Sequence, residues 1–183
     1  MTLPSQSVIK HAFERLPLLE YAARSLISYR MLIERAEDEA TKNSFWRTTA
    51  TALLGDALIN WSHLFGRMPE SEYWRSITFE QKAFRDLVYN KCNFTYQKLF
   101  EYRSQVSSLG KRYRDGAIDS TVLRDKIDLA IAEEILLIAI DWCRDINMSE
   151  GIGAKEAVLQ THYVEQIRGQ VKNVLEYNFT PDS

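Results

Sequence analysis

Apolar residues recur along this chain at spacings of three and four positions, which places them on one face of an α-helix. Between residues 6 and 38 they form one such stripe, and Pro17 is expected to kink that helix or to divide it. A second stripe runs from about Asn43 to Phe65, where Gly66 is placed to end the helix. Alternating apolar and polar runs of strand length are hard to find. The pattern therefore predicts helices and no sheet.

A third helix is expected after a loop at residues 66–77. Thr78 and Gln81 have the spacing of a capping box, in which a hydroxyl and an amide three positions later satisfy the first backbone N–H groups. The apolar pattern then continues from Phe79 to about Leu109. We expect one continuous rod of about 45 Å there.

Two more helices are expected in the last third of the chain. Asp119 or Ser120 can cap a fourth helix that runs to about Ile146. Its middle, LAIAEEILLIAIDW, is apolar almost all round, which is typical of a helix surrounded by others. A fifth helix is expected from about Lys155 to Tyr177, followed by a frayed tail at 178–183.

These five helices predict a single all-α domain over residues 1–183, an antiparallel helical bundle. Apolar residues make up 45% of the chain, enough for one core. A formal net charge of -2 gives no global attraction for polyanions, so any RNA site must be a local patch. Without a signal-peptide core or an uninterrupted apolar span, we expect a cytoplasmic protein with no membrane contact. Cys92 and Cys143 are then expected to be buried, reduced thiols.

Metal and cofactor motifs are missing from the chain. None of the three histidines, His11, His63 and His162, follows a glutamate by three positions, the spacing that a di-iron site in a helical bundle needs. Cys-x-x-Cys and His-Glu-x-x-His patterns, glycine-rich nucleotide loops and nucleophile elbows are absent too. The sequence therefore predicts no metal site and no cofactor.

Two adjacent carboxylates, Glu133 and Glu134, lie within the apolar stretch of the fourth helix. A buried carboxylate needs a cation or a donor nearby. An arginine from the first or the third helix, such as Arg24 or Arg103, is the expected partner. We expect this pairing to be structural.

The basic turn in SSLGKRYRDGAIDS, residues 107–120, carries the strongest chemical signal. Lys111, Arg112 and Arg114 fall within four positions at a helix end. Cations there can simply offset the helix dipole. They can also bind phosphates, with Tyr113 available to stack on a base. Both interpretations fit the residues alone.

Two stretches, DALINWSHLFG followed by YWRSI, and FEYRSQVSSLGKRYRDGAID, resemble the HEPN superfamily of small helical bundles. They are most similar to its abortive-infection-like branch. The shared pattern is a helix with a Trp, a polar pair and Leu-Phe-Gly, a tryptophan in the next loop, and a long helix that ends in an Arg-Asp turn. The resemblance covers about residues 56–120.

The resemblance implies a four- or five-helix bundle that pairs into a homodimer. Active members cleave RNA without metal, through an arginine and a histidine a few residues later in the dimer cleft. Arg114 matches the arginine, with Arg112 an equal candidate, and the position of the histidine falls at or near Asp119. Residues 64–161 contain no histidine. An aspartate cannot serve as acid and base at neutral pH unless its pKa is raised strongly, and it repels phosphate.

The leading hypothesis is a dimeric, HEPN-like protein with a degenerate catalytic motif, Arg114 and Asp119. It binds RNA or a protein partner in a defence or toxin–antitoxin setting. The residues expected to contact RNA or the partner are Lys111, Arg112, Tyr113 and Arg114.

Two alternatives stay open from the sequence. One is an active, metal-independent endoribonuclease that uses Asp119 or a distant histidine, His63 or His162. The other is a helical interaction module with no nucleic-acid role, whose aromatic loop presents Tyr73 and Trp74.

Overall fold

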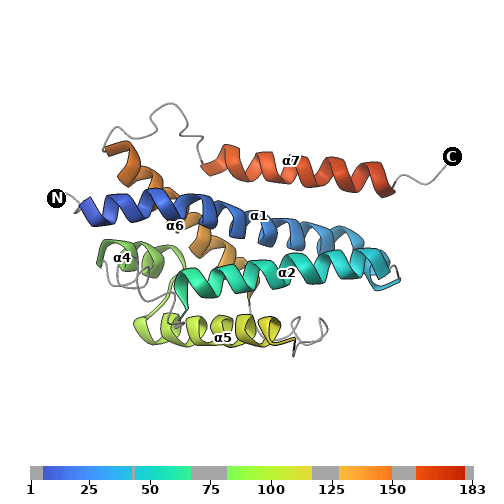
Figure 1. The fold of residues 1–183 in the computed structure, drawn as a ribbon, viewed down its shortest axis with the longest axis horizontal. Helices are drawn as coiled ribbons and strands as arrows, with labels where there is room; N and C mark the ends of the chain where they lie inside the picture. Colours follow the sequence, from blue (N-terminus) through green and yellow to red (C-terminus); the bar gives the residue numbers. More distant parts are fainter. Residues whose placement is uncertain (1–5, 43, 67–81, 117–127, 150–159, 180–183) are drawn as a thin grey trace.

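The computed structural model describes residues 6–42, 44–66, 82–116, 128–149 and 160–179. These ranges contain helices and no strand, so the all-α prediction is confirmed (Figure 1). The described helices are α1 (Gln6–Lys42), α2 (Ser44–Phe65), α4 (Lys82–Lys91), α5 (Tyr96–Arg114), α6 (Leu129–Ser149) and α7 (Gln160–Phe179).

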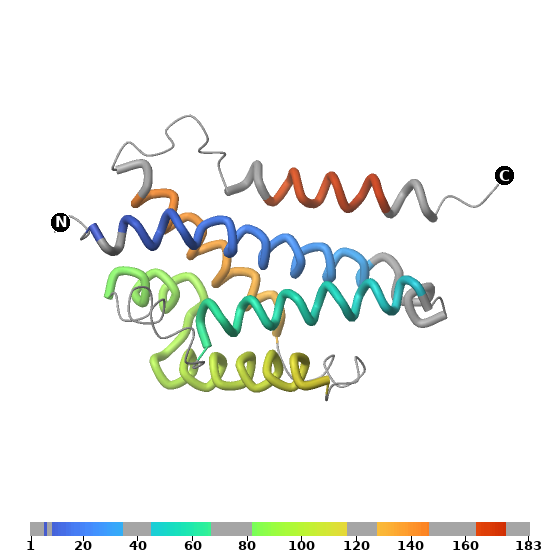
Figure 2. Tube along the Cα trace, in the orientation of Figure 1, coloured from blue at the N-terminus to red at the C-terminus, as the bar shows by residue number. Residues whose placement is uncertain are grey.

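The long helices lie as a row of rods, with α7, α1, α2 and α5 side by side and α6 crossing them obliquely (Figures 1 and 2). Helix α1 contacts α2, α6 and α7, while α5 packs on the other side of α2. Consecutive neighbours α1 and α2 run in opposite directions, as do α2 and α5. The arrangement leaves α5 at one edge of the bundle, where one side of the helix is open to solvent.

Helix α6 buries most of its described apolar side chains, in line with its apolar sequence. Ile135, Leu136, Ala139, Ile140 and Cys143 are all completely buried. The Nε1–H of Trp61 on α2 also donates to the carbonyl oxygen of Ala132 at 3.3 Å, which satisfies the polar end of a buried indole. The core therefore lies where α1, α2 and α6 meet.

Helix α1 is not divided at Pro17, contrary to one of the two sequence-based expectations. The helix runs from Gln6 to Lys42 with the proline inside it. Pro17 removes one backbone hydrogen bond and is exposed. Ala12 and Leu19, on either side of it, are fully buried, so packing against the bundle holds both halves in one helix.

The third helix was predicted wrongly as one rod from Phe79 to Leu109, because the chain breaks between α4 and α5. Asn93 has a φ of 51°, in the left-handed region that asparagine tolerates better than most residues. Thr95 then caps α5, its side-chain oxygen accepting from the backbone N–H of Lys98 at 3.2 Å. The break turns Phe94 into the core, where its ring lies 5.8 Å from that of Tyr102.

The start of α6 was also misplaced. The helix begins at Leu129, and the carboxylate of Asp128 accepts from the N–H of Ala130 at 3.0 Å, so the cap is Asp128 and neither Asp119 nor Ser120. The expected start of the fifth helix at Lys155, like Asp119 and Ser120, lies outside the described residues. Tyr73 and Trp74 lie outside them as well.

Candidate functional site: the basic helix α5

Helix α5 concentrates positive charge in a chain that is slightly acidic. The whole sequence carries a formal charge of -2. Within Tyr96–Arg114 there is one carboxylate, Glu101, against five cations, which gives this helix a formal charge of +4. The cations are Lys98, Arg103, Lys111, Arg112 and Arg114. A local patch able to attract a polyanion is therefore present on the edge helix of the bundle.

The C-terminal end of α5 holds three of these cations in an accessible position. Lys111 and Arg112 are exposed and form no ion pair with a residue of the described ranges. Arg114 is 43% exposed, and its Nε lies 3.5 Å from Oδ1 of Asp115. Gly116 follows with a φ of 69°, a left-handed conformation that glycine adopts without strain. The helix thus ends sharply just after its basic turn.

Tyr113 is part of the contact between α5 and α2. Its ring lies against Gly55, where an added Cβ would stand 2.8 Å from ring carbon Cδ1. The side chain is half-buried and its hydroxyl is enclosed. One side of the ring is thereby covered by α2, and the stacking of a base on Tyr113 stays a prediction.

The two helices are held together by small residues that let their backbones approach closely. A Cβ on Gly110 would stand 2.1 Å from Oγ of Ser62, and one on Gly66 would stand 2.5 Å from Oγ of Ser107. Ser62 Oγ donates to the carbonyl oxygen of Leu58 at 2.6 Å and lies 3.4 Å from that of Val106. We call the contacts of Gly55, Ser62 and Gly66 with α5 the α2–α5 seam.

The guanidinium of Arg103 adds a hydrogen bond at the Phe65 end of this seam. Arg103 Nε donates to the carbonyl oxygen of Phe65 at 2.8 Å, near the last turn of α2, where carbonyl groups lack helical partners. Tyr102 donates its hydroxyl to the carbonyl oxygen of Asp128 at 2.8 Å and so ties α5 to the start of α6. Helix α5, whose C-terminal end carries the basic turn, is therefore attached both to α2 and to the start of α6.

The seam contains some of the residues that carry the resemblance, namely Ser62, Gly66 and Gly110. Sequence reasoning missed this packing role. A signal was available, because a glycine in a helical stretch costs about 1 kcal/mol relative to alanine and usually has a packing reason.

His63 does not reach the basic turn within one chain. Gly55 lies beside Tyr113, and His63 is eight residues further along α2, or about 12 Å along the helix axis. Arg114 is directed toward Asp115, beyond the far end of the seam. The Nε2 atom of His63 is enclosed and has no hydrogen-bond partner among the described residues. The His162 side chain and Asp119 lie outside those residues.

Glu133 is paired with Arg30, and neither of the two expected arginines is its partner. Arg30 Nη1 lies 2.6 Å from Oε2 of Glu133, which links α1 to α6. Arg24 is exposed on α1, and Arg103 donates to α2 as described above. The expected pairing of Glu133 with an arginine of the first helix is therefore confirmed, although that arginine is Arg30 and Arg24 had been given as the example.

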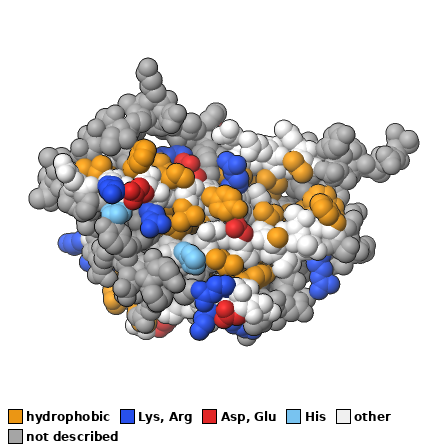
Figure 3. Space-filling view, viewed as in Figure 1, with side chains coloured by type: hydrophobic (Ala, Val, Ile, Leu, Met, Phe, Trp, Pro, Cys, Tyr) orange, Lys and Arg blue, Asp and Glu red, His pale blue; other side chains and the backbone are white. Residues whose placement is uncertain are grey.

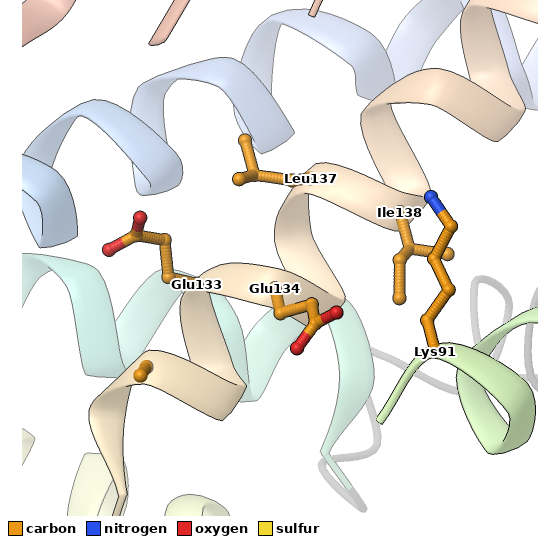
Figure 4. Close-up of a pocket in the computed structure, with 6 residues that line it drawn as sticks. Lys91, Glu133, Glu134, Leu137 and Ile138 are labelled. Carbon is orange, nitrogen blue, oxygen red and sulfur yellow. The ribbon is translucent and has the colours of Figure 1, made fainter. Parts of the chain in front are cut away.

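A small pocket of about 330 Å³ lies beside this pair, between the end of α4 and α6 (Figure 4). Glu133 and Glu134 point away from each other, and Lys91 extends from α4 alongside Ile138. Burial, and next the charge of Glu134, raise the pKa of the neighbouring Cys92 thiol to about 11. Little of a thiol with such a pKa is ionised at neutral pH, so Cys92 is a poor nucleophile there.

Both cysteines are free; Cys143 is buried as expected, whereas Cys92 is only half-buried. Within the described ranges, no group of three or more His, Cys, Asp or Glu side chains could hold a metal ion. None of the described helices combines the length and the hydropathy needed to cross a bilayer.

No family model matches the chain, and no curated protein or solved structure is significantly similar to it.

Proposed function

We propose that the chain is a HEPN-like helical protein that pairs with a second copy of itself and binds RNA through the basic end of α5. In this proposal the RNA-binding site is retained and catalysis is lost. The support is the quoted resemblance, the helical architecture, and the concentration of charge on one helix.

The observation that carries the proposal is the exposure of Lys111, Arg112 and Arg114 on a rigid support. Gly110 against Ser62, and Tyr113 against Gly55, fix the last two turns of α5 on α2. A backbone that is already ordered loses little entropy on binding. Guanidinium groups donate paired hydrogen bonds to phosphate oxygens, and these strengthen the attraction between the charges.

Among the described residues, no histidine lies near the basic turn, and this supports the proposed loss of catalysis. A general acid or base must lie within hydrogen-bond reach of the reacting atom, directly or through one water. Asp119 occupies the position of the expected histidine in sequence, and His63 lies about 12 Å along α2 from the level of Tyr113. Phosphate binding without hydrolysis is therefore the chemistry that fits these residues.

The test is the affinity for fluorescent single-stranded RNA, measured by anisotropy over a series of salt concentrations. The variant replaces Lys111, Arg112 and Arg114 by alanine. Each lost phosphate contact on a single strand should reduce the magnitude of the salt slope by about 0.7, so the slope should fall by about 2.

The control variant removes the same charge elsewhere, through Arg24→Ala, Lys82→Ala and Arg168→Ala, all at exposed positions on other helices. Equal losses in both variants would show that the binding is diffuse, and no RNA binding by the wild-type protein would refute the proposal. Metal-independent cleavage of RNA that Arg114→Ala abolishes would instead establish the ribonuclease alternative.

A further inference from the structure

We propose that the ligand of the basic turn is unpaired RNA, and that Tyr96, at the opposite end of α5, stacks on one of its bases. This inference rests on the proposed function and specifies the class of RNA, because a base inside a duplex has no free face for an aromatic ring. We call Tyr96, with Tyr89 and Arg85 of α4, the aromatic end of α5.

Tyr96 has an accessible ring. At 66%, it is more exposed than the other large apolar or aromatic side chains of the described ranges. It is the first residue of α5, directly after the cap Thr95. Exposed apolar side chains occur singly on most proteins, so the exposure of Tyr96 gains meaning only from its position and its neighbours.

The register of α5 puts Tyr96 on the same side of the helix as the basic turn. Arg114 is eighteen positions further on, which is five whole turns, so the two side chains leave the helix in the same direction. Lys111 is turned by roughly 60° from that direction. Glu101 is turned from Tyr96 by roughly 140°, and Gln97 donates to Glu101 there. A line of about 27 Å thus joins an exposed ring to exposed cations.

The surroundings of Tyr96 combine a second aromatic ring with positive charge. Burial raises the pKa of the half-buried Tyr89, whose hydroxyl also lies within electrostatic range of Tyr96. Two arginines, Arg85 and Arg103, and one carboxylate, Asp86, act on the same hydroxyl. Cations therefore outnumber carboxylates beside the exposed ring.

This combination is typical of proteins that bind single strands. Cations follow the phosphates of the strand, and aromatic side chains stack on its bases. On the face shown in Figure 3, Lys and Arg side chains lie at the surface along the lower edge of the molecule, where α5 runs. A strand held at both ends of α5 can stay solvated between them, so no enclosed polar atom of the helix has to be reached.

The test separates stacking from phosphate binding by its dependence on salt. The probe is a fluorescent single-stranded RNA of about 12 nucleotides, which lies within the range of known site sizes. Tyr96→Ala should weaken its binding about tenfold at every salt concentration and leave the salt slope unchanged, because stacking releases no counterions. The alanine substitutions at Lys111, Arg112 and Arg114, by contrast, reduce the slope.

Tyr96→Phe and Tyr21→Ala are the matched controls. Tyr96→Phe keeps the ring and should change the affinity less than about twofold. Tyr21 is 54% exposed on α1, so Tyr21→Ala removes a similar ring elsewhere and should also change the affinity less than about twofold. An unfolding midpoint of Tyr96→Ala in urea close to that of the wild-type protein checks that the variant folds.

Two further measurements concern the bases themselves. 2-Aminopurine placed at successive positions of the RNA should lose fluorescence at one position on binding, and Tyr96→Phe should keep this loss while Tyr96→Ala removes it. Tyr96→Ala should leave the affinity for an RNA duplex unchanged, since paired bases do not reach the ring.

Three results would overturn the stacking role of Tyr96 and leave phosphate binding at the basic turn in place. They are an unchanged affinity of Tyr96→Ala, an equal loss in Tyr21→Ala, and a loss in Tyr96→Ala that comes with a smaller salt slope. A wild-type protein that binds no RNA would refute the proposed function itself, and the role of Tyr96 with it.

Discussion

Gly110 of α5 lies so close to Ser62 of α2 that a Cβ on the glycine would stand 2.1 Å from the serine Oγ. The carbonyl oxygen of Leu58 would be 2.8 Å away. Real Cβ atoms do not approach oxygen atoms so closely, so only glycine lets the two helices come together here. The position of the basic turn on the molecule therefore depends on a residue that has no side chain.

The first prediction concerns this contact. Gly110→Ala should lower the free energy of unfolding by about 1–3 kcal/mol, since a methyl group in a close-packed interface displaces neighbours, and the Leu58 carbonyl is backbone that cannot rotate away. Urea denaturation followed by circular dichroism measures this as a lower midpoint with an unchanged slope. An unchanged midpoint would mean that α2 and α5 are farther apart than the structure shows.

Gly169 provides the matched control. It lies inside α7, is exposed, and has no heavy atom within 4 Å of the position a Cβ would occupy. Gly169→Ala should therefore raise the free energy of unfolding by up to about 1 kcal/mol, because alanine favours the helix. If Gly→Ala lowers the free energy of unfolding at position 110 and raises it at position 169, the effect of packing is separated from that of helix propensity.

The second prediction concerns Arg30. Arg30→Ala leaves Glu133, whose side chain is 10% exposed, without its cation. Removing one partner of a fully buried ion pair lowers the free energy of unfolding by about 3–5 kcal/mol, and breaking an exposed pair lowers it by about 0–1 kcal/mol. Because the Arg30 side chain is 32% exposed, we expect Arg30→Ala to lower the free energy of unfolding by about 1–2 kcal/mol. Arg24→Ala, on an exposed position of the same helix, should change stability by less than about 0.5 kcal/mol. Equal effects of the two substitutions would exclude the assigned pairing.

The helical class could be predicted from the sequence because amphipathic spacing is a local property. The stripe of α2, its end at Gly66 and the enclosed middle of α6 all follow from residues within a few turns of one another. The break between α4 and α5 was missed because the apolar pattern continues across it. Asn93 and Thr95 were its local signals, a left-handed residue followed by a cap.

Pairings between helices could not be predicted in the same way. The charge of Glu133 indicates that a cation is needed, but α1 offers both Arg24 and Arg30, and only the register of α1 against α6 selects Arg30. The same register problem hid the contact of Gly110 with Ser62, which are far apart in sequence. The basic turn was visible in the sequence, whereas its support by α2 was not.

The third prediction tests the cap that starts α5. Thr95→Ala should cost about 1 kcal/mol, because the N–H of Lys98 loses its acceptor. Thr51 is the control, since its hydroxyl donates to the carbonyl of Arg47 inside α2, where that carbonyl already has a helical partner. Thr51→Ala should leave the unfolding midpoint unchanged or raise it slightly. A larger loss at 51 than at 95 would contradict the position of the break.

The fourth prediction uses the reactivity of Cys92. Its pKa of about 11 results mainly from burial, with Glu134 adding to the rise. Only the thiolate reacts with iodoacetamide, and at pH 8 roughly one Cys92 in a thousand is ionised. The rate of alkylation in the folded protein should therefore climb about tenfold per pH unit from 8 to 10 without levelling.

The two cysteines can be separated by mass spectrometry and by Cys92→Ser. Cys143 is fully buried, and burial raises the pKa of its thiol even further. We therefore expect Cys143 to be alkylated only after the protein unfolds. Glu134→Gln removes a nearby negative charge and should bring the pKa of Cys92 down, while burial keeps it above that of the denatured chain. Since the Glu134 carboxylate lies on α6 and the Cys92 thiol lies directly after the end of α4, a downward shift of the Cys92 pKa would confirm how α6 packs against this end of α4. A rate that levels off near pH 9 in the folded protein would show that Cys92 is solvated and that this contact is absent.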